Sequence, residues 1–167
     1  MVRFADGPLV EVSTVVAAPP ERVWELVSDI DLPARFQDEF VGATWVDGDG
    51  TTGIGASFVG RNRRGSREWE TTSWIVAYLP EREFGWAVSD PENPGAVWTY
   101  HLEPLGAGTL LRYRRVLGPG ASGLTRATEK HPDRQEEIIA HRDEEHRTNM
   151  RAVLDGIRRL AEGRNAD

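Results

Sequence analysis

The stretch EEIIAHRDEEHRTNMRAVLDGI, residues 136–157, has the apolar spacing of a helix that packs one face against another layer. At about 100° per residue, five apolar side chains fall on one stripe: Ile139, Met150, Val153, Ile157 and Leu160. Asp143 and His146 lie inside the same stripe, and Arg142 lies at its edge. The sequence therefore predicts a long core-facing helix over residues 132–161, with polar groups in the middle of its packed face.

The chain before this helix begins with one strand and two short helices. Apolar and polar side chains alternate in residues 9–17, so this strand buries one face. Two segments with helical spacing follow, APPERVWELVSD (18–29) and DLPARFQDEF (31–40). The prolines that open the first of them end the strand and suit the start of a helix. Asp29 is expected to act as a turn or cap residue.

Six further strands are predicted between residues 41 and 118, joined by short turns rich in Gly, Pro and Asp. They are VGATWVDGDG (41–50), GIGASFVGRNRR (53–64), REWETTSWIVAYLP (67–80), EREFGWAVSD (81–90), GAVWTYHLEP (95–104) and GTLLRYRRVLG (108–118). Residues 118–131 read as a loop with one helical turn. Because the helices do not alternate with the strands, the fold class is α+β, with an antiparallel sheet that covers the long helix.

Composition restricts the classes of function. The 167 residues favour one domain over residues 1–167, with its core at about 8–162. The net charge of −7 disfavours nucleic-acid binding, and the absence of Cys excludes disulfides and thiolate-bound metals. The histidines lack the spacing of metal ligands, so neither a metal nor an organic cofactor is expected. With no signal peptide and no apolar span, a cytoplasmic protein without membrane insertion is expected.

Four strings, taken in order, resemble the SRPBCC superfamily of START-like, helix-grip proteins, and the polyketide cyclase/dehydrase-type subgroup in particular. They are APPERVWELVSD (18–29), LPEREFGWAV (79–88), GPGASGL (118–124) and HRDEEHRTNMRAVLDGIRRLAEG (141–163). The resemblance implies a helix-grip fold, in which a curved seven-stranded antiparallel sheet wraps a long C-terminal helix. It also implies a cavity between the two for a hydrophobic small molecule such as a lipid, sterol or polyketide.

Several residues are candidates for the walls of such a cavity: Trp74, Trp86, Trp98, Tyr100, Tyr113, Arg115 and Met150. Trp86 shares a strand face with Phe84, and Trp98 shares one with Tyr100. Aromatic side chains on an inner face line a ligand pocket or simply fill the core, and both outcomes stay open. Tyr113 and Arg115 are expected to point inward, although a register led by Leu110 would reverse them.

Asp143 and His146 are the candidate catalytic residues, because positions three apart are neighbours on a helix face. An aspartate can orient an imidazole and raise its basicity for acid/base chemistry. Arg142 would then help to orient the polar end of a ligand. The alternative is a buried polar cluster, in which these groups satisfy one another or pair with Arg115 or Tyr113.

Three functions are consistent with these features. The first is binding of a polyketide-like or lipid-like molecule, with cyclisation or dehydration by acid/base chemistry that needs no metal or organic cofactor. The second is a non-catalytic carrier or sensor of a lipid, and the third is a protein-interaction module. The partner expected in the first two is a hydrophobic small molecule, and the chain is expected to be a monomer or a homodimer.

Overall fold

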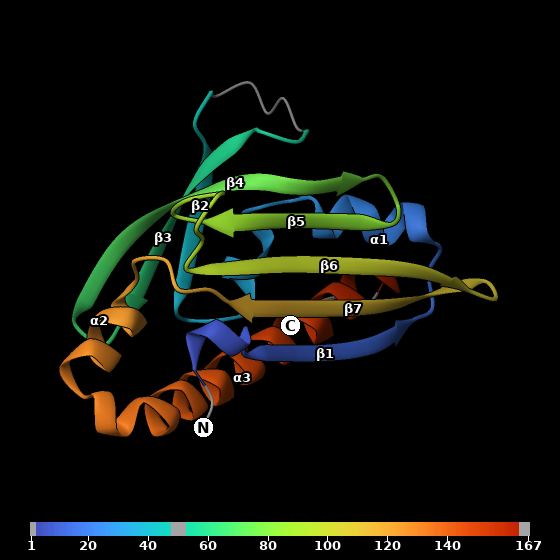
Figure 1. Cartoon of the computed structure of the whole chain (residues 1–167). Coiled ribbons are helices and arrows are strands. Elements are labelled where there is room, and N and C mark those ends of the chain that lie inside the picture. The colour runs from blue at the N-terminus through green and yellow to red at the C-terminus, as the bar shows by residue number, and fades with distance from the viewer. Residues whose placement is uncertain (1–2, 48–52, 164–167) are drawn as a thin grey trace.

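Seven antiparallel strands form one curved sheet, and helix α3 (Gln135–Ala161) lies across its inner face (Figure 1). The structure is a computed structural model, and it describes residues 3–47 and 53–163. The strands are β1 (Leu9–Val16), β2 (Phe40–Trp45), β3 (Ser57–Arg64), β4 (Arg67–Leu79), β5 (Glu83–Val88), β6 (Ala96–Leu105) and β7 (Gly108–Leu117). Their order across the sheet is β1-β7-β6-β5-β4-β3-β2. This confirms the predicted strand count and α+β class, while the expected turn between β2 and β3 lies mostly in residues 48–52, outside the described residues.

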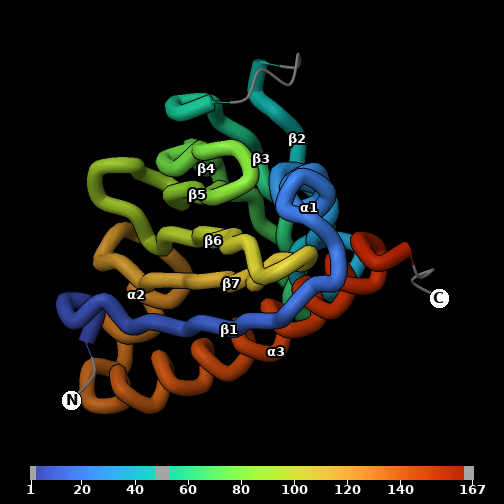
Figure 2. The backbone as a smooth tube through the Cα atoms, turned by 90° about the vertical axis from the view of Figure 1, so that its right-hand side faces the viewer, coloured from blue at the N-terminus to red at the C-terminus, as the bar shows by residue number. Residues whose placement is uncertain are grey.

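The two short helices after β1 are α1 (Pro20–Val27) and the 3-10 helix η2 (Leu32–Arg35). Asp29 stands between them, and its carboxylate accepts the backbone N–H of Asp31, which is the turn role predicted for it. A further 3-10 turn, η1 (Phe4–Asp6), precedes β1. Seen from the side, α1 lies close to the C-terminal end of α3 (Figure 2).

The segment after β7 contains more helix than the sequence indicated. Helix α2 (Gly123–Lys130) has eight residues rather than a single turn, and the 3-10 turn η3 (Pro132–Arg134) separates it from α3. Ser122 caps α2, since its hydroxyl accepts the N–H of Thr125 and the Thr125 hydroxyl accepts the N–H of Ser122. This reciprocal pair satisfies backbone donors that would otherwise be left open at the start of the helix.

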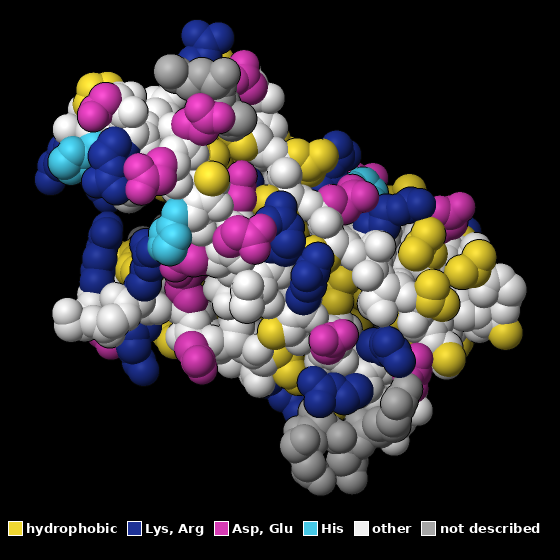
Figure 3. Space-filling model, turned by 90° about the horizontal axis from the view of Figure 1, so that it is seen from below, with side chains coloured by type: hydrophobic (Ala, Val, Ile, Leu, Met, Phe, Trp, Pro, Cys, Tyr) yellow, Lys and Arg dark blue, Asp and Glu magenta, His cyan; other side chains and the backbone are white. Residues whose placement is uncertain are grey.

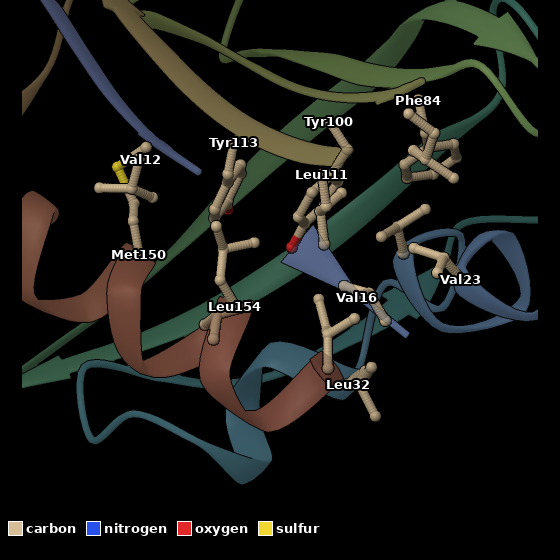
Figure 4. Packing of buried hydrophobic residues seen from close by; sticks show 14 of the residues in the cluster. Val12, Val16, Val23, Leu32, Phe84, Tyr100, Leu111, Tyr113, Met150 and Leu154 are labelled. Carbon is tan, nitrogen blue, oxygen red and sulfur yellow. The ribbon is translucent and has the colours of Figure 1, made fainter. Parts of the chain in front are cut away.

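The C-terminal half of α3 packs on the sheet as an ordinary core helix. Met150 and Leu154 point from α3 toward Val12 and Tyr113 on the strands (Figure 4). Val153 and Ile157 are almost fully buried, as the apolar stripe predicted, and Leu154, which lies outside that stripe, is buried as well. This end of the space between sheet and helix is therefore filled.

Gly156 fixes α3 against η2. A Cβ atom at this position would collide with the ring of Phe36, the residue that follows η2. The Phe36 ring occupies the space that a side chain at position 156 would fill, so the two residues pack directly against each other. The small residue thus lets the helix approach η2 more closely than any other residue would.

The inner face of β7 follows the register favoured by Leu111. Leu111, Tyr113 and Arg115 are buried, whereas Leu110 and Val116 are only partly buried. The register led by Leu110 is thereby excluded, and a guanidinium enters the space under the sheet. Within the described residues, no helix is both long enough and apolar enough to span a membrane.

Candidate functional site

A cavity of about 920 Å³ lies between the inner face of the sheet and the N-terminal half of α3. Such a volume lies within the usual range of roughly 300–1,000 Å³ for small-molecule sites. Its inner wall is mostly aromatic: Phe58, Phe84, Trp86, Trp98, Tyr100 and Tyr113. Met150 borders the cavity where the packed core begins. The cavity thus occupies the part of α3 where polar residues interrupt the apolar stripe.

The aromatic side chains form stacked pairs across neighbouring strands. The Trp86 and Trp98 rings have centroids 6.4 Å apart and planes 10° from parallel. Tyr100 and Tyr113 stack at 4.1 Å and 13°. Both pairs lie directly opposite one another in the strand register, so the backbone pairing holds them in place. The result is a wall of flat apolar surfaces suited to a planar ligand.

The two tyrosine hydroxyls stay protonated at neutral pH. Burial raises the pKa of Tyr100 well above its ordinary value, and the neighbouring Tyr113 raises it further. Burial also raises the pKa of Tyr113, against the lowering effect of its hydrogen bond with Tyr100. Neither group can act as a base at physiological pH, but each can hydrogen-bond.

Arg115 lies between the two candidate catalytic residues. Its side chain is fully buried, and Nη1 lies 2.8 Å from His146 Nδ1. Nη2 donates to Asp143 Oδ1 at 2.6 Å and to the Pro8 carbonyl at 3.2 Å. Asp143 therefore holds Arg115, and Arg115 holds His146. The predicted direct orientation of His146 by Asp143 is corrected accordingly.

Charge and burial keep His146 neutral. The residue is 8% exposed, and burial is the main reason that its pKa lies well below the ordinary value of a histidine. The positive charges of Arg142, Arg115 and Arg64 lower the pKa further. The imidazole lies edge-on to Trp98, with ring centroids 5.0 Å apart, and borders the cavity. It is thus a neutral polar group in an aromatic wall.

Burial of Arg115 lowers its pKa, and the hydrogen bond and charge of Asp143 oppose that effect. A guanidinium starts from so high a pKa that it remains charged at neutral pH. Its Nε is the one buried side-chain nitrogen or oxygen without a hydrogen-bond partner among the described residues. Arg115 itself does not line the cavity. Arg115 lies behind the lining residues and can influence a ligand only through His146, which it contacts.

Ion pairs surround the outer part of the cavity. Arg142 on α3 donates to both carboxylate oxygens of Glu39 at 2.6 and 2.9 Å. Arg64 on β3 donates to Glu145 on α3 at 2.6 Å. His141 lies 3.5 Å from Glu145. Charged side chains of both signs gather around a notch at the left edge of Figure 3, the side on which α2 lies in Figure 1. Arg142 is thus paired with Glu39 and also lines the cavity.

Most of the predicted wall residues border the cavity, but Trp74 and Arg115 do not. Trp86, Trp98, Tyr100, Tyr113, Arg142, His146 and Met150 are all lining residues. Trp74 lies on the outer face of the sheet, because its neighbours Ser73 and Ile75 are buried on the inner face. The prediction that Trp74 binds a ligand is corrected for this reason.

Trp69 is a lining residue that the sequence reasoning did not select. It alternates with Thr71 and Ser73 on the inner face of β4, a period-2 pattern that the sequence already contains. Among the described residues, no group of three or more His, Asp or Glu side chains is placed to hold a metal ion.

Comparisons with known proteins agree with this architecture. The family described as "Polyketide cyclase / dehydrase and lipid transport" matches residues 8–162. The Polyketide_cyc-like protein Cgl2372 from Corynebacterium glutamicum is 33% identical, with 92% of this chain and 91% of that chain covered and a TM-score of 0.67. A search of curated proteins found no match.

Two aromatase/cyclases share the fold at lower identity. The ZhuI aromatase/cyclase from Streptomyces sp. R1128 is 19% identical over 91% of this chain and 94% of that chain, with a TM-score of 0.66. The di-domain aromatase/cyclase StfQ of the steffimycin biosynthetic pathway is 15% identical over 96% of this chain and 52% of that chain, with a TM-score of 0.71. The predicted helix-grip fold and SRPBCC resemblance are confirmed, and the chain belongs to the polyketide cyclase/dehydrase and lipid transport family.

Proposed function

We propose that this protein binds a hydrophobic, polyketide-like or lipid-like small molecule between the sheet and the N-terminal half of α3. The observation that carries the proposal is the cavity of about 920 Å³ with stacked aromatic walls. Contact with flat aromatic surfaces favours a ligand with fused or conjugated rings. The family match, whose description names both polyketide cyclases and lipid transport, supports the same class of ligand.

Polar groups inside the cavity would orient such a ligand. The imidazole of His146 lies next to Trp98 in the aromatic wall, and the hydroxyls of Tyr100 and Tyr113 belong to the same inner region. A few polar groups in an apolar pocket fix the orientation of a ligand and supply specificity. A carbonyl group on the ligand is the natural partner for these groups.

As an enzyme, the protein would act mainly by positioning. Holding a flexible chain in a folded conformation brings reacting atoms together, and a fixed hydrogen-bond donor stabilises charge that develops on a carbonyl oxygen. Because the pKa of His146 is lowered and those of both tyrosines are raised, none of the three titrates near neutral pH. Cyclisation or dehydration would therefore depend on shape and polarisation more than on proton transfer by His146.

Carriage of a lipid-like molecule without chemistry is the second candidate function. The same pKa shifts favour it, since a carrier needs apolar walls and hydrogen-bonding groups but no group poised to exchange protons. Native mass spectrometry of protein purified from its own host distinguishes the two. A retained, unmodified lipid supports the carrier, and conversion of a supplied polyketide by ligand-free protein supports the enzyme.

The cavity itself is tested by filling it. Ser73 is buried and lines the cavity, while Thr72 precedes it on β4 and does not line it. We expect Ser73→Phe to abolish binding of aromatic polyketides and fatty acids, and Thr72→Phe to leave it unchanged. Equal binding by Ser73→Phe and the wild-type protein, with thermal melts showing both folded, would place the ligand elsewhere.

A further inference from the structure

Arg115 determines which nitrogen of His146 carries the proton. A guanidinium has only N–H donors and no acceptor. Since Arg115 Nη1 lies 2.8 Å from His146 Nδ1, that nitrogen must be the acceptor. In a neutral imidazole, one nitrogen donates and the other accepts, so the ring proton resides on Nε2.

The surroundings of the ring oppose any change in this arrangement. A proton on Nδ1 would place the imidazole N–H directly against the N–H of Arg115 Nη1. The positive charges that act on the ring are Arg115 on β7, Arg64 on β3 and Arg142 on α3. Their carboxylate partners are Asp143, Glu145 and Glu39, in that order. The carboxylate of Asp143 is bound to Arg115, so it stabilises the guanidinium and does not accept from the imidazole. Protonation of the ring would bring a further positive charge against three arginines.

The other ring nitrogen is available to a ligand. His146 borders the cavity, and its Nε2 makes no hydrogen bond with any residue in the described part of the chain. Nε2 is also not fully buried. Among those residues, the one fully buried side-chain nitrogen without a hydrogen-bond partner is Arg115 Nε. The edge-on contact with Trp98 holds the ring at the wall. A residue that borders the cavity therefore carries an N–H group without a partner among the described residues.

We propose that Arg115 is a positioning residue that sets His146 as a permanent hydrogen-bond donor, and that the cavity consequently selects ligands with a carbonyl or similar acceptor at this point. This deepens the proposed function, on which its ligand part rests. It assigns His146 the role of a fixed donor instead of that of a general base. A ligand that could only donate to His146 would leave the imidazole N–H unsatisfied, and the cavity disfavours it.

The tautomer can be measured in the free protein. Two-bond ¹H–¹⁵N spectra of protein labelled with ¹⁵N-histidine separate the protonated from the unprotonated ring nitrogen. We expect His146 to show Nε2–H with an unprotonated Nδ1, and to keep that pattern from pH 8 to pH 5. A proton on Nδ1, or an imidazolium at pH 7, would overturn the proposal without reference to any ligand.

Removing the guanidinium tests whether Arg115 sets the tautomer. The test uses the double variant Arg115→Met/Asp143→Asn. The second substitution is included because Asp143 would otherwise be left without its guanidinium partner. We expect the Nδ1–H tautomer to become populated and the ring to titrate closer to the ordinary pKa of about 6.5. An unchanged tautomer and an unchanged titration in a folded double variant would mean that Arg115 is purely structural. If the variant does not fold, the wild-type spectra still decide the proposal.

The ligand part is tested with 9-fluorenone and fluorene, two flat probes that share one tricyclic skeleton and differ at a carbonyl. A single hydrogen bond predicts about ten-fold tighter binding of fluorenone, measured by NMR titration. The preference should vanish in His146→Phe, which keeps a ring beside Trp98 but has no N–H. Equal affinity of the wild type for both probes would refute selection by His146. Binding of neither probe would count against the cavity function, while the tautomer result would stand.

Discussion

Tyr100 and Tyr113 stack face to face across β6 and β7, with ring centroids 4.1 Å apart and both side chains almost completely buried. The strand register places them directly opposite one another. They therefore contribute to the core and to the cavity wall at once. A consequence is that the pH stability of the protein depends on their hydroxyls.

The first prediction concerns alkaline pH. Because burial raises the pKa of Tyr100 and Tyr113, the folded state keeps their protons where the unfolded chain loses them, above about pH 10. Their contribution to stability is complete below that pH and is lost as the pH rises further. Tyrosinate absorbance should therefore show two of the three tyrosines ionising only together with unfolding. In Tyr100→Phe/Tyr113→Phe this late phase should disappear, and its persistence would contradict the assignment.

The second prediction concerns mildly acidic pH. The pKa of His146 is lowered in the folded state, so below about pH 6.5 the unfolded chain binds a proton that the folded chain does not. The free energy of unfolding should consequently fall as the pH drops from 7.5 to 5, as measured by urea titration. In His146→Phe this part of the slope should be absent. Identical slopes in the two proteins would show that His146 contributes nothing to the pH dependence.

The third prediction compares two neighbouring acids on α3. Asp143→Asn weakens a pair whose partner, Arg115, is fully buried, and it should cost about 3 kcal/mol, the lower end for breaking a buried pair, since Asp143 is 21% exposed. Glu144, the next residue, pairs with Arg147 at the surface. Glu144→Gln should cost less than about 1 kcal/mol. Chemical denaturation of both variants measures the difference, and similar losses would mean that burial of Arg115 is unimportant.

The fourth prediction concerns the contact between Gly156 and Phe36. Gly156→Ala gains helix propensity, but its methyl group collides with the Phe36 ring, so a net loss of about 1–2 kcal/mol is expected. Introducing Phe36→Leu into that variant should recover part of the loss by making room. A stabilised Gly156→Ala protein would show that η2 moves away at little cost.

The sequence was sufficient for the features that repeat along the chain. Alternation in residues 9–17 located β1 and its buried face, and the stripe through Met150 and Ile157 located α3. Alternation also predicted that Tyr113 and Arg115 point inward, and both are buried. Each of these signals is local and periodic, so neighbouring residues reinforce it.

The sequence was insufficient where partners meet from distant positions. Arg142 and Glu39 are 103 residues apart, and Arg115 and His146 are 31 apart, so no local pattern pairs them. Helix α2 was underestimated because it begins with Gly123, a weak helix former, and its cap uses Thr125 where Glu or Gln is usual. Pairing and capping depend on geometry that composition does not encode.

The two halves of α3 are packed differently, and this difference affects local opening of the helix. Its second half is packed by Val153, Ile157 and the Gly156–Phe36 contact. Its first half spans the cavity and is held by one buried apolar residue, Ile139, and by polar contacts such as Arg142–Glu39. Transient local opening therefore requires less free energy in the first half. Backbone amides near residues 136–146 should exchange with deuterated solvent sooner than those near 150–160, and a ligand would pass beneath the end of the helix that opens first.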